Sequence, residues 1–104
     1  MTDTKDYVPH GKLINFAKEV YQSVGLNEED ALLAADTLVQ AELWGHSSHG
    51  MLRLAWYYAR LKSGAMKPVT NTSLLVDSQA IAVMDGGDGV GQVIAKRAMM
   101  ESVK

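Results

Sequence analysis

The apolar positions in the first part of the chain recur with the spacing of amphipathic helices. Between residues 11 and 24 they lie three or four residues apart, which predicts a helix that ends at Gly25. A second helix should follow, because Asn27 can cap it and three acidic residues occupy its first turn, where the helix dipole favours negative charge. The connection is short, so we expect an antiparallel pair. The predicted stripes are Leu13, Phe16, Ala17, Val20 and Val24 for the first helix, and Leu32, Ala35, Leu38, Val39 and Leu43 for the second.

A third helix is predicted after a short polar segment. Either Ser47 or Ser48 can cap it, the apolar spacing continues to about Lys62, and Gly64 follows as a helix end. In such a helix His49 and Arg53, four residues apart, would lie on one face.

Beyond residue 73 the pattern is typical of strands. Residues 74–77 and 80–84 are predicted as two short strands around a Ser-Gln turn, and a glycine-rich turn at residues 85–89 leads into a last helix. The Lys96–Arg97 doublet of that helix is expected on its solvated face. No Gly, Asn or Pro terminator follows in this helix, which suggests a piece of a longer protein.

The expected fold class is α+β: a three-helix segment, a short two-stranded piece and a further helix. We divide the chain into a polar tail at residues 1–10, a helical N-terminal domain at residues 11–73 and a truncated strand–helix portion at residues 74–104.

Composition and charge exclude several classes of partner. Ten basic and twelve acidic residues give a net charge of -2, so we expect no nucleic acid and no membrane partner. The absence of Cys excludes disulfides and thiolate chemistry and fits a reducing compartment. The chain opens with a polar stretch and has no apolar run of membrane-spanning length, so we expect a cytoplasmic protein.

The glycine-rich turn lies where a dinucleotide-binding loop would lie, between a predicted strand and a predicted helix. Its spacing differs, because Gly87, Gly89 and Gly91 give G-x-G-x-G and Gln92 occupies the position of the last glycine of G-x-G-x-x-G. Two aspartates in the turn would also repel a pyrophosphate. We therefore predict a simple strand-to-helix turn.

The polar segment holds other candidate chemistry. His46 and His49 lack the H-E-x-x-H spacing and have only Glu42 as a nearby carboxylate, so we expect no metal. Ser47 and Ser48 lack the G-x-S-x-G context of a nucleophilic serine.

His49 and Arg53 remain as a candidate site for a small organic acid. A helix start offers free N–H groups, and the planar guanidinium of Arg53 suits a carboxylate. An imidazole titrates near neutral pH, so His49 could exchange a proton with an oxygen beside that carboxylate. The positive potential at a helix start and the charge of Arg53 both favour the neutral imidazole of His49. A role of His49 as an acid would therefore require a compensating carboxylate or the negative charge of the substrate. The alternative is that His49 only caps a turn and Arg53 makes a surface ion pair.

Residues 41–54, AELWGHSSHGMLRL, resemble the S-H-G-x-x-R signature of the malate/L-lactate dehydrogenase family. This group of NAD(P)-dependent 2-oxo-acid reductases includes ureidoglycolate and 2,3-diketogulonate enzymes. A second block, residues 84–92, resembles the D-G-x-x-G-x-G-Q segment of the family, and Tyr57, Leu61, Gly64 and Pro68 follow the first block at family-like spacing. The similarity extends from residue 11 to residue 104.

The resemblance implies roles for individual residues. His49 corresponds to the proton donor, and Ser48, Arg53 and Tyr57 correspond to substrate contacts. Many members carry Asp immediately before the serine of S-H-G, whereas this chain has Ser47.

The implied activity is hydride transfer between NAD or NADP and a small 2-oxo or 2-hydroxy acid, in a homodimer. Family chains are roughly three times this length, so the chain would be the N-terminal part of a larger non-Rossmann oxidoreductase. Its cofactor would bind mostly beyond Lys104, so no cofactor-binding residue is assigned. The competing hypothesis is that the chain alone is an inactive helical packing or dimerisation module.

Overall fold

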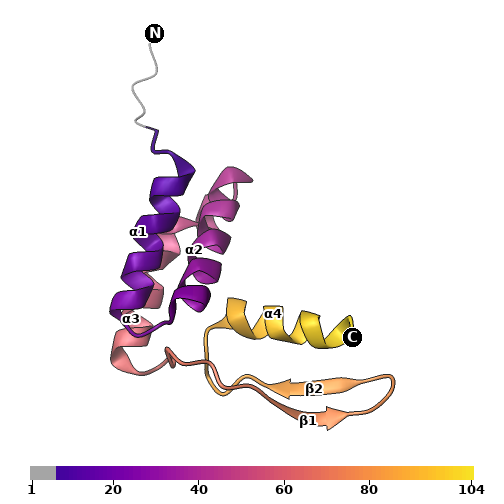
Figure 1. Ribbon diagram of the computed structural model, residues 1–104. Coiled ribbons are helices and arrows are strands. Elements are labelled where there is room, and N and C mark those ends of the chain that lie inside the picture. Colours follow the sequence, from indigo (N-terminus) through magenta and orange to yellow (C-terminus); the bar gives the residue numbers. More distant parts are fainter. Residues whose placement is uncertain (1–6) are drawn as a thin grey trace.

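The computed structural model describes residues 7–104, which form four α-helices and one two-stranded antiparallel sheet (Figure 1). The predicted α+β class is therefore confirmed. Residues 1–6 of the predicted polar tail lie outside the described residues, and the first helix already begins at His10. The elements are α1 (His10–Ser23), α2 (Glu28–Leu43), α3 (Leu54–Ser63), β1 (Ser73–Asp77), β2 (Ala82–Asp85) and α4 (Gly91–Ser102).

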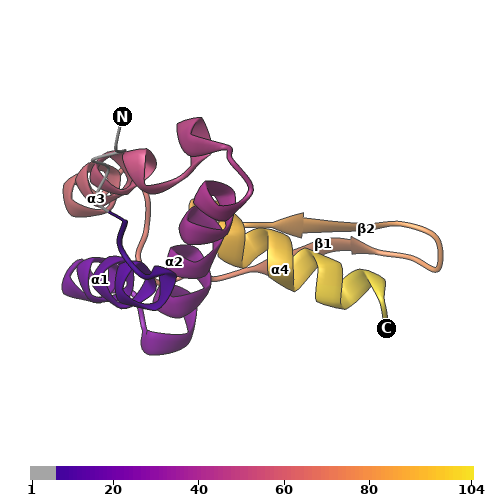
Figure 2. The ribbon, with the colours of Figure 1, turned by 90° about the horizontal axis from the view of Figure 1, so that it is seen from above.

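Helices α1 and α2 form the expected antiparallel pair, side by side in both views (Figures 1 and 2). Asn27 caps α2 as predicted: its side-chain oxygen accepts a hydrogen bond from the backbone N–H of Asp30 at 2.8 Å. Alanines bring the two helices close together, since Ala17 of α1 and Ala31, Ala34 and Ala35 of α2 are fully buried.

The core joins these alanines to residues from the other helices. Phe16, Leu32 and Leu43, which belong to the predicted stripes, are exposed instead. The helices approach through their small side chains, so these larger apolar residues lie beside the contact and outside it. The remaining buried apolar residues of the cluster are Tyr21, Leu26, Leu38, Leu54, Leu61, Val90 and Val93.

The third helix begins later than the sequence predicts. Two 3-10 turns, η1 (Ser47–His49) and η2 (Met51–Arg53), precede α3, which starts at Leu54. Gly50 separates the two turns with a non-helical ψ of -141°. The expectation of one continuous helix carrying His49 and Arg53 on one face is therefore wrong. The end at Gly64 is as predicted.

Strands β1 and β2 form a hairpin that projects with α4 away from the three-helix part (Figure 2). The register places Ser73 opposite Asp85, Leu74 opposite Met84, Val76 opposite Val83 and Asp77 opposite Ala82, with an irregularity between Leu74 and Val76. The resulting shape is long, with extents of 60 × 30 × 21 Å and a radius of gyration of 15.9 Å. A compact chain of this length would have a radius of about 13 Å.

The turn after β2 is held by its own backbone and by Thr70. Gly87 has φ +61°, and a Cβ there would lie 2.6 Å from the carbonyl oxygen of Asn71, so this position requires glycine. The N–H of Val90 donates to Thr70 Oγ1 at 3.1 Å, and Arg97 of α4 donates to the Thr70 carbonyl. The turn connects strand β2 to helix α4, as the sequence predicts. Arg97 is half-buried in this contact, so the expectation of a solvated Lys96–Arg97 doublet holds only for Lys96. Within residues 7–104, no helix combines the length and the apolar character that crossing a membrane requires.

Candidate functional site

Three of the predicted site residues are joined by hydrogen bonds in the segment between α2 and α3. The hydroxyl of Ser48 lies 2.9 Å from His49 Nδ1, and Arg53 Nε donates to the carbonyl oxygen of Ser48 at 2.9 Å. The backbone and side chain of Ser48 therefore connect the imidazole to the guanidinium. Because Nδ1 faces the hydroxyl, Nε2 is the ring nitrogen left for another partner.

Only part of the Arg53 guanidinium is engaged by other residues of the described chain. It is half-buried, and its guanidinium carbon lies 5.8 Å from the centroid of the Trp56 ring, within the range of a cation–π contact. With Nε donating to Ser48, the two terminal nitrogens have no acceptor among residues 7–104. A planar pair of N–H donors of this kind suits a carboxylate.

Tyr57, the fourth predicted site residue, lies on α3 and is fixed mainly by packing. Its ring is half-buried against the core and lies 5.2 Å from the Trp56 ring, centroid to centroid, at 54°. The described residues show no hydrogen bond between Tyr57 and Ser48, His49 or Arg53. The ring of Trp56 contacts both Tyr57 and Arg53, and so connects these two residues by packing.

His49 borders a cavity of about 370 Å³ against the last turns of α2. Neither Ser48, Arg53 nor Tyr57 lines this cavity. Ser48 and His49 are exposed, so within the described part of the chain the hydrogen-bonded group sits on an open surface. The cavity is lined by Asp36, Thr37, Gln40, Ala41, Trp44, His46 and His49.

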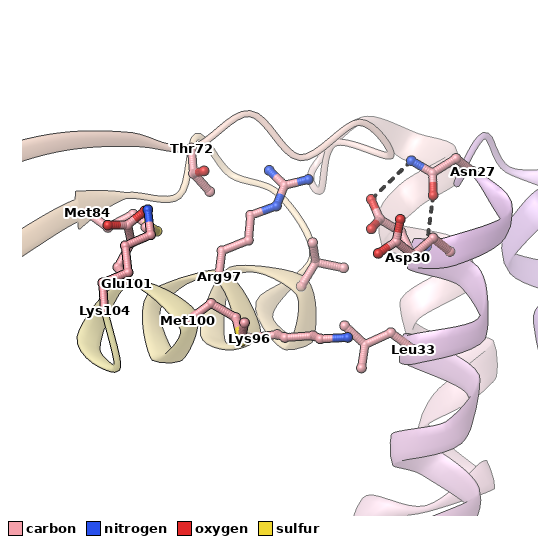
Figure 3. A pocket seen from close by; sticks show the side chains of 12 residues that line it. Asn27, Asp30, Leu33, Thr72, Met84, Lys96, Arg97, Met100, Glu101 and Lys104 are labelled. Atoms are coloured by element: carbon pink, nitrogen blue, oxygen red, sulfur yellow. Dashed lines mark hydrogen bonds and ion pairs between the residues drawn. The ribbon is translucent and has the colours of Figure 1, made fainter.

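A larger cavity, of about 570 Å³, lies between the start of α2 and α4 and includes none of the predicted site residues (Figure 3). Figure 3 shows Asn27 and Asp30 on one side and Lys96 and Arg97 on the other. Its three cationic and three anionic side chains offset one another, and Arg97 is already engaged with Thr70. This cavity is therefore no counterpart of the anion site predicted at Arg53.

Glu42 is the residue that sequence reasoning missed. In the sequence it is only a carboxylate near two histidines, whereas in the structure its carboxylate accepts hydrogen bonds from the backbone N–H of Met51 at 3.0 Å and from the hydroxyl of Ser47 at 3.2 Å. No local pattern indicates these bonds, because they join the last turn of α2 to residues beyond a chain reversal. As for metals, residues 7–104 contain no group of three or more His, Cys, Asp or Glu side chains placed to hold an ion.

The glycine-rich turn does not fit a nicotinamide dinucleotide. The N–H of Gly87 donates to Asp85 Oδ1 at 2.9 Å, that of Gly89 to the Gly86 carbonyl at 3.2 Å, and that of Val90 to Thr70. These amides are therefore not free for a pyrophosphate, and the exposed Asp85 and Asp88 would repel one. No residue described here is assigned to a cofactor.

Comparison with known proteins places the chain among the dehydrogenases. Residues 8–104 match the family model described as malate/L-lactate dehydrogenase. The chain belongs to this family, and it matches the N-terminal region of its relatives.

Two relatives illustrate the similarity. L-sulfolactate dehydrogenase of Methanocaldococcus jannaschii is 41% identical over 86 residues, which are 83% of this chain and 25% of the relative. Malate dehydrogenase of Pyrococcus horikoshii is 36% identical over 97 residues, which are 93% of this chain and 27% of the relative. The solved structure of the Pyrococcus horikoshii enzyme superposes with a TM-score of 0.87 at 35% identity, covering 92% of this chain and 30% of that chain. The chain thus spans about a quarter of the length of the curated relatives it matches.

Proposed function

We propose that this chain is the N-terminal part of an NAD(P)-dependent enzyme that transfers a hydride between its cofactor and a small 2-oxo or 2-hydroxy acid. The observation that carries the proposal is the pair of hydrogen bonds that joins Arg53, Ser48 and His49. Membership of a dehydrogenase family supports it. The enzyme is further proposed to be a cytoplasmic homodimer.

In this proposal the two terminal nitrogens of Arg53 bind the carboxylate of the acid, and His49 Nε2 exchanges a proton with the oxygen on C2. In reduction the imidazolium gives a proton to the 2-oxo oxygen, and in oxidation the neutral ring takes one from the 2-hydroxyl. Tyr57, which lies one turn beyond Arg53, is proposed to contact the acid through its hydroxyl. These residues account for anion binding and proton transfer, and no step is assigned to them at the cofactor.

Ser48 allows His49 to work in both directions. A hydroxyl can accept a hydrogen bond from a protonated Nδ1, and with the proton on Nδ1 the neutral ring leaves Nε2 bare to take the substrate proton. The same 2.9 Å contact therefore serves the charged and the neutral imidazole. The carboxylate of the bound acid supplies the negative charge that an acid role of His49 requires beside Arg53, since Glu42 is bonded elsewhere.

Replacement of His49 tests the proposal. In the full-length dehydrogenase that contains this chain, we expect His49→Ala to lower kcat by roughly a hundredfold or more, the scale of lost acid–base help. Steady-state kinetics of malate oxidation and of the reverse reduction would measure this. His10→Ala, an exposed histidine at the start of α1, is the matched control and should keep normal turnover. Near-normal turnover of His49→Ala would exclude His49 from the mechanism.

A second candidate function is a packing or dimerisation module without activity of its own. The hairpin favours it, because Leu75 and Ile81 are 65% and 64% exposed. The kinetics of His49→Ala separate the two, because a packing module without catalytic residues predicts near-normal turnover. Saturable binding of NADH by the 104-residue chain, followed by fluorescence, would contradict the packing module.

A further inference from the structure

We infer that Glu42 is a positioning residue: its carboxylate fixes the backbone that carries Ser48, His49 and Arg53. The inference rests on the proposed function for the importance of those three residues. The geometric part, that Glu42 holds this segment in place, is independent of it and can be measured separately.

Glu42 binds the segment at two points, one before and one after His49. The hydroxyl of Ser47 donates to one carboxylate oxygen at 3.2 Å, and the backbone N–H of Met51 donates to the other at 3.0 Å. Hydrogen bonds to a charged acceptor are stronger than neutral ones. The carboxylate of Glu42, on the last turn of α2, therefore holds residues 48–50 from both ends.

Gly50 allows this arrangement by leaving room for the carboxylate. A Cβ at Gly50 would lie 2.6 Å from the carboxyl carbon of Glu42, and nearer still to one of its oxygens. The side chain of Glu42 thus occupies the space that a side chain at residue 50 would need. This contact also explains why η1 and η2 do not merge into one helix, since the Met51 N–H is bonded to Glu42 and not to a preceding turn.

The charge of Glu42 has no counter-ion in the described part of the chain, where the ion pairs are Lys18–Glu28 and Lys104–Glu101. Half-buried and unpaired with a cation, the carboxylate is stabilised by donors from the segment it holds. It needs a donor at residue 47, which Ser47 supplies. Removing that hydroxyl would leave one carboxylate oxygen of Glu42 without its donor.

The first experiment compares Glu42→Ala with Glu42→Gln in the full-length dehydrogenase. Glutamine can keep both bonds, because its oxygen accepts from Met51 and its nitrogen donates to the Ser47 hydroxyl. We expect Glu42→Ala to speed hydrogen exchange at the Met51 amide by roughly tenfold or more and to lower kcat for malate oxidation by a similar factor. Glu42→Gln should stay within about threefold of the parent in both. Glu19→Ala, an exposed carboxylate on α1, is the matched control and should change neither.

The second experiment tests the hydroxyl at residue 47. Ser47→Ala removes one of the two bonds and should speed Met51 exchange and lower kcat by less than Glu42→Ala does, whereas Ser47→Thr keeps a hydroxyl and should change neither. This pair keeps the inference testable if Glu42→Ala fails to fold. A merely structural role would lower thermal stability and speed exchange in α1 as well.

The two proposals fail differently. Unchanged Met51 exchange in Glu42→Ala, or equal effects of Ser47→Ala and Ser47→Thr, would overturn the positioning role. Normal turnover of His49→Ala together with fast Met51 exchange in Glu42→Ala would overturn the proposed function and leave Glu42 as the anchor of the segment.

Discussion

Tyr21 is enclosed in the core with no hydrogen-bond partner for its hydroxyl among residues 7–104. Burial, and to a lesser extent the neighbouring Tyr57, raise the pKa of the Tyr21 phenol well above its ordinary value. The neutral phenol is therefore strongly preferred in the folded chain. A buried hydroxyl without a partner also costs free energy, since it has exchanged water for apolar surroundings.

Stability should consequently fall at alkaline pH. Below about pH 10 the phenol is neutral in both states and its contribution is constant. Above that pH the unfolded chain ionises and the folded chain does not, so the free energy of unfolding decreases by up to about 1.4 kcal/mol per pH unit. Urea unfolding of the parent and of Tyr21→Phe between pH 7 and pH 11 measures the difference.

The phenylalanine variant should lose this extra slope and at pH 7 should be unchanged or more stable by up to about 1 kcal/mol. Subtracting the two curves removes the titration of lysines, which both proteins share. An identical alkaline slope in the two would contradict the assignment to Tyr21.

At the scale of elements, the cap of α2 makes a measurable contribution. The side chain of Asn27 satisfies the N–H of Asp30, which would otherwise lack a partner at the helix start. Asn27→Ala should lower the free energy of unfolding by about 1 kcal/mol, and Asn27→Ser should recover most of it. Chemical denaturation measures both. Asn15→Ala, an exposed site within α1, serves as control and should be neutral or slightly stabilising. A loss at Asn15 as large as that at Asn27 would show that the cap is not the cause.

The elements that the sequence predicted well are those with local signals. The caps and the helical spacing located α1 and α2, and alternation with turn residues located the two strands. The sequence predicts the start of α3 too early, because a serine that can cap a helix is a local signal. Here a tertiary contact outweighs that signal. The carboxylate of Glu42 takes the Met51 N–H and the space beside Gly50, which no spacing rule foresees.

In the candidate site, too, the sequence indicates some features and leaves others unpredictable. A motif indicated Ser48, His49 and Arg53, and the structure brings them together. What joins Arg53 to the group is a main-chain carbonyl, and such an oxygen is present at every residue, so the sequence gives no hint of which one is used. The spacing also did not indicate that Phe16 and Leu32 are exposed, because Ala31 and Ala34, which lie outside the predicted stripe, share the helix contact with Ala17 and Ala35.

At the scale of the whole molecule, the chain is elongated and leaves much apolar surface uncovered. Large apolar side chains of the hairpin and of α4 are exposed, among them Leu75, Ile81, Met99 and Met100. Exposed patches of this extent favour association. We expect the 104-residue chain to self-associate as its concentration rises, with light scattering after size-exclusion chromatography as the measurement.

Charges in the hairpin should reduce that association. Leu75→Lys combined with Ile81→Lys places two cations on the exposed ribbon and should shift the chain toward monomer. Asn15→Lys adds a charge on the exposed face of α1 and is the control. A monomeric parent chain, or equal behaviour of the hairpin and control variants, would contradict an associating hairpin.

The pairing of β1 with β2 alone has one more consequence. Each strand of this ribbon has an outer edge whose main-chain donors and acceptors have no strand beside them within residues 7–104. A two-stranded ribbon is marginal by itself, and it gains most from a third strand laid along one edge. A third strand would bind through main-chain hydrogen bonds, so its register along the edge fixes its position. Its alternating side chains would decide only which face of the sheet they cover.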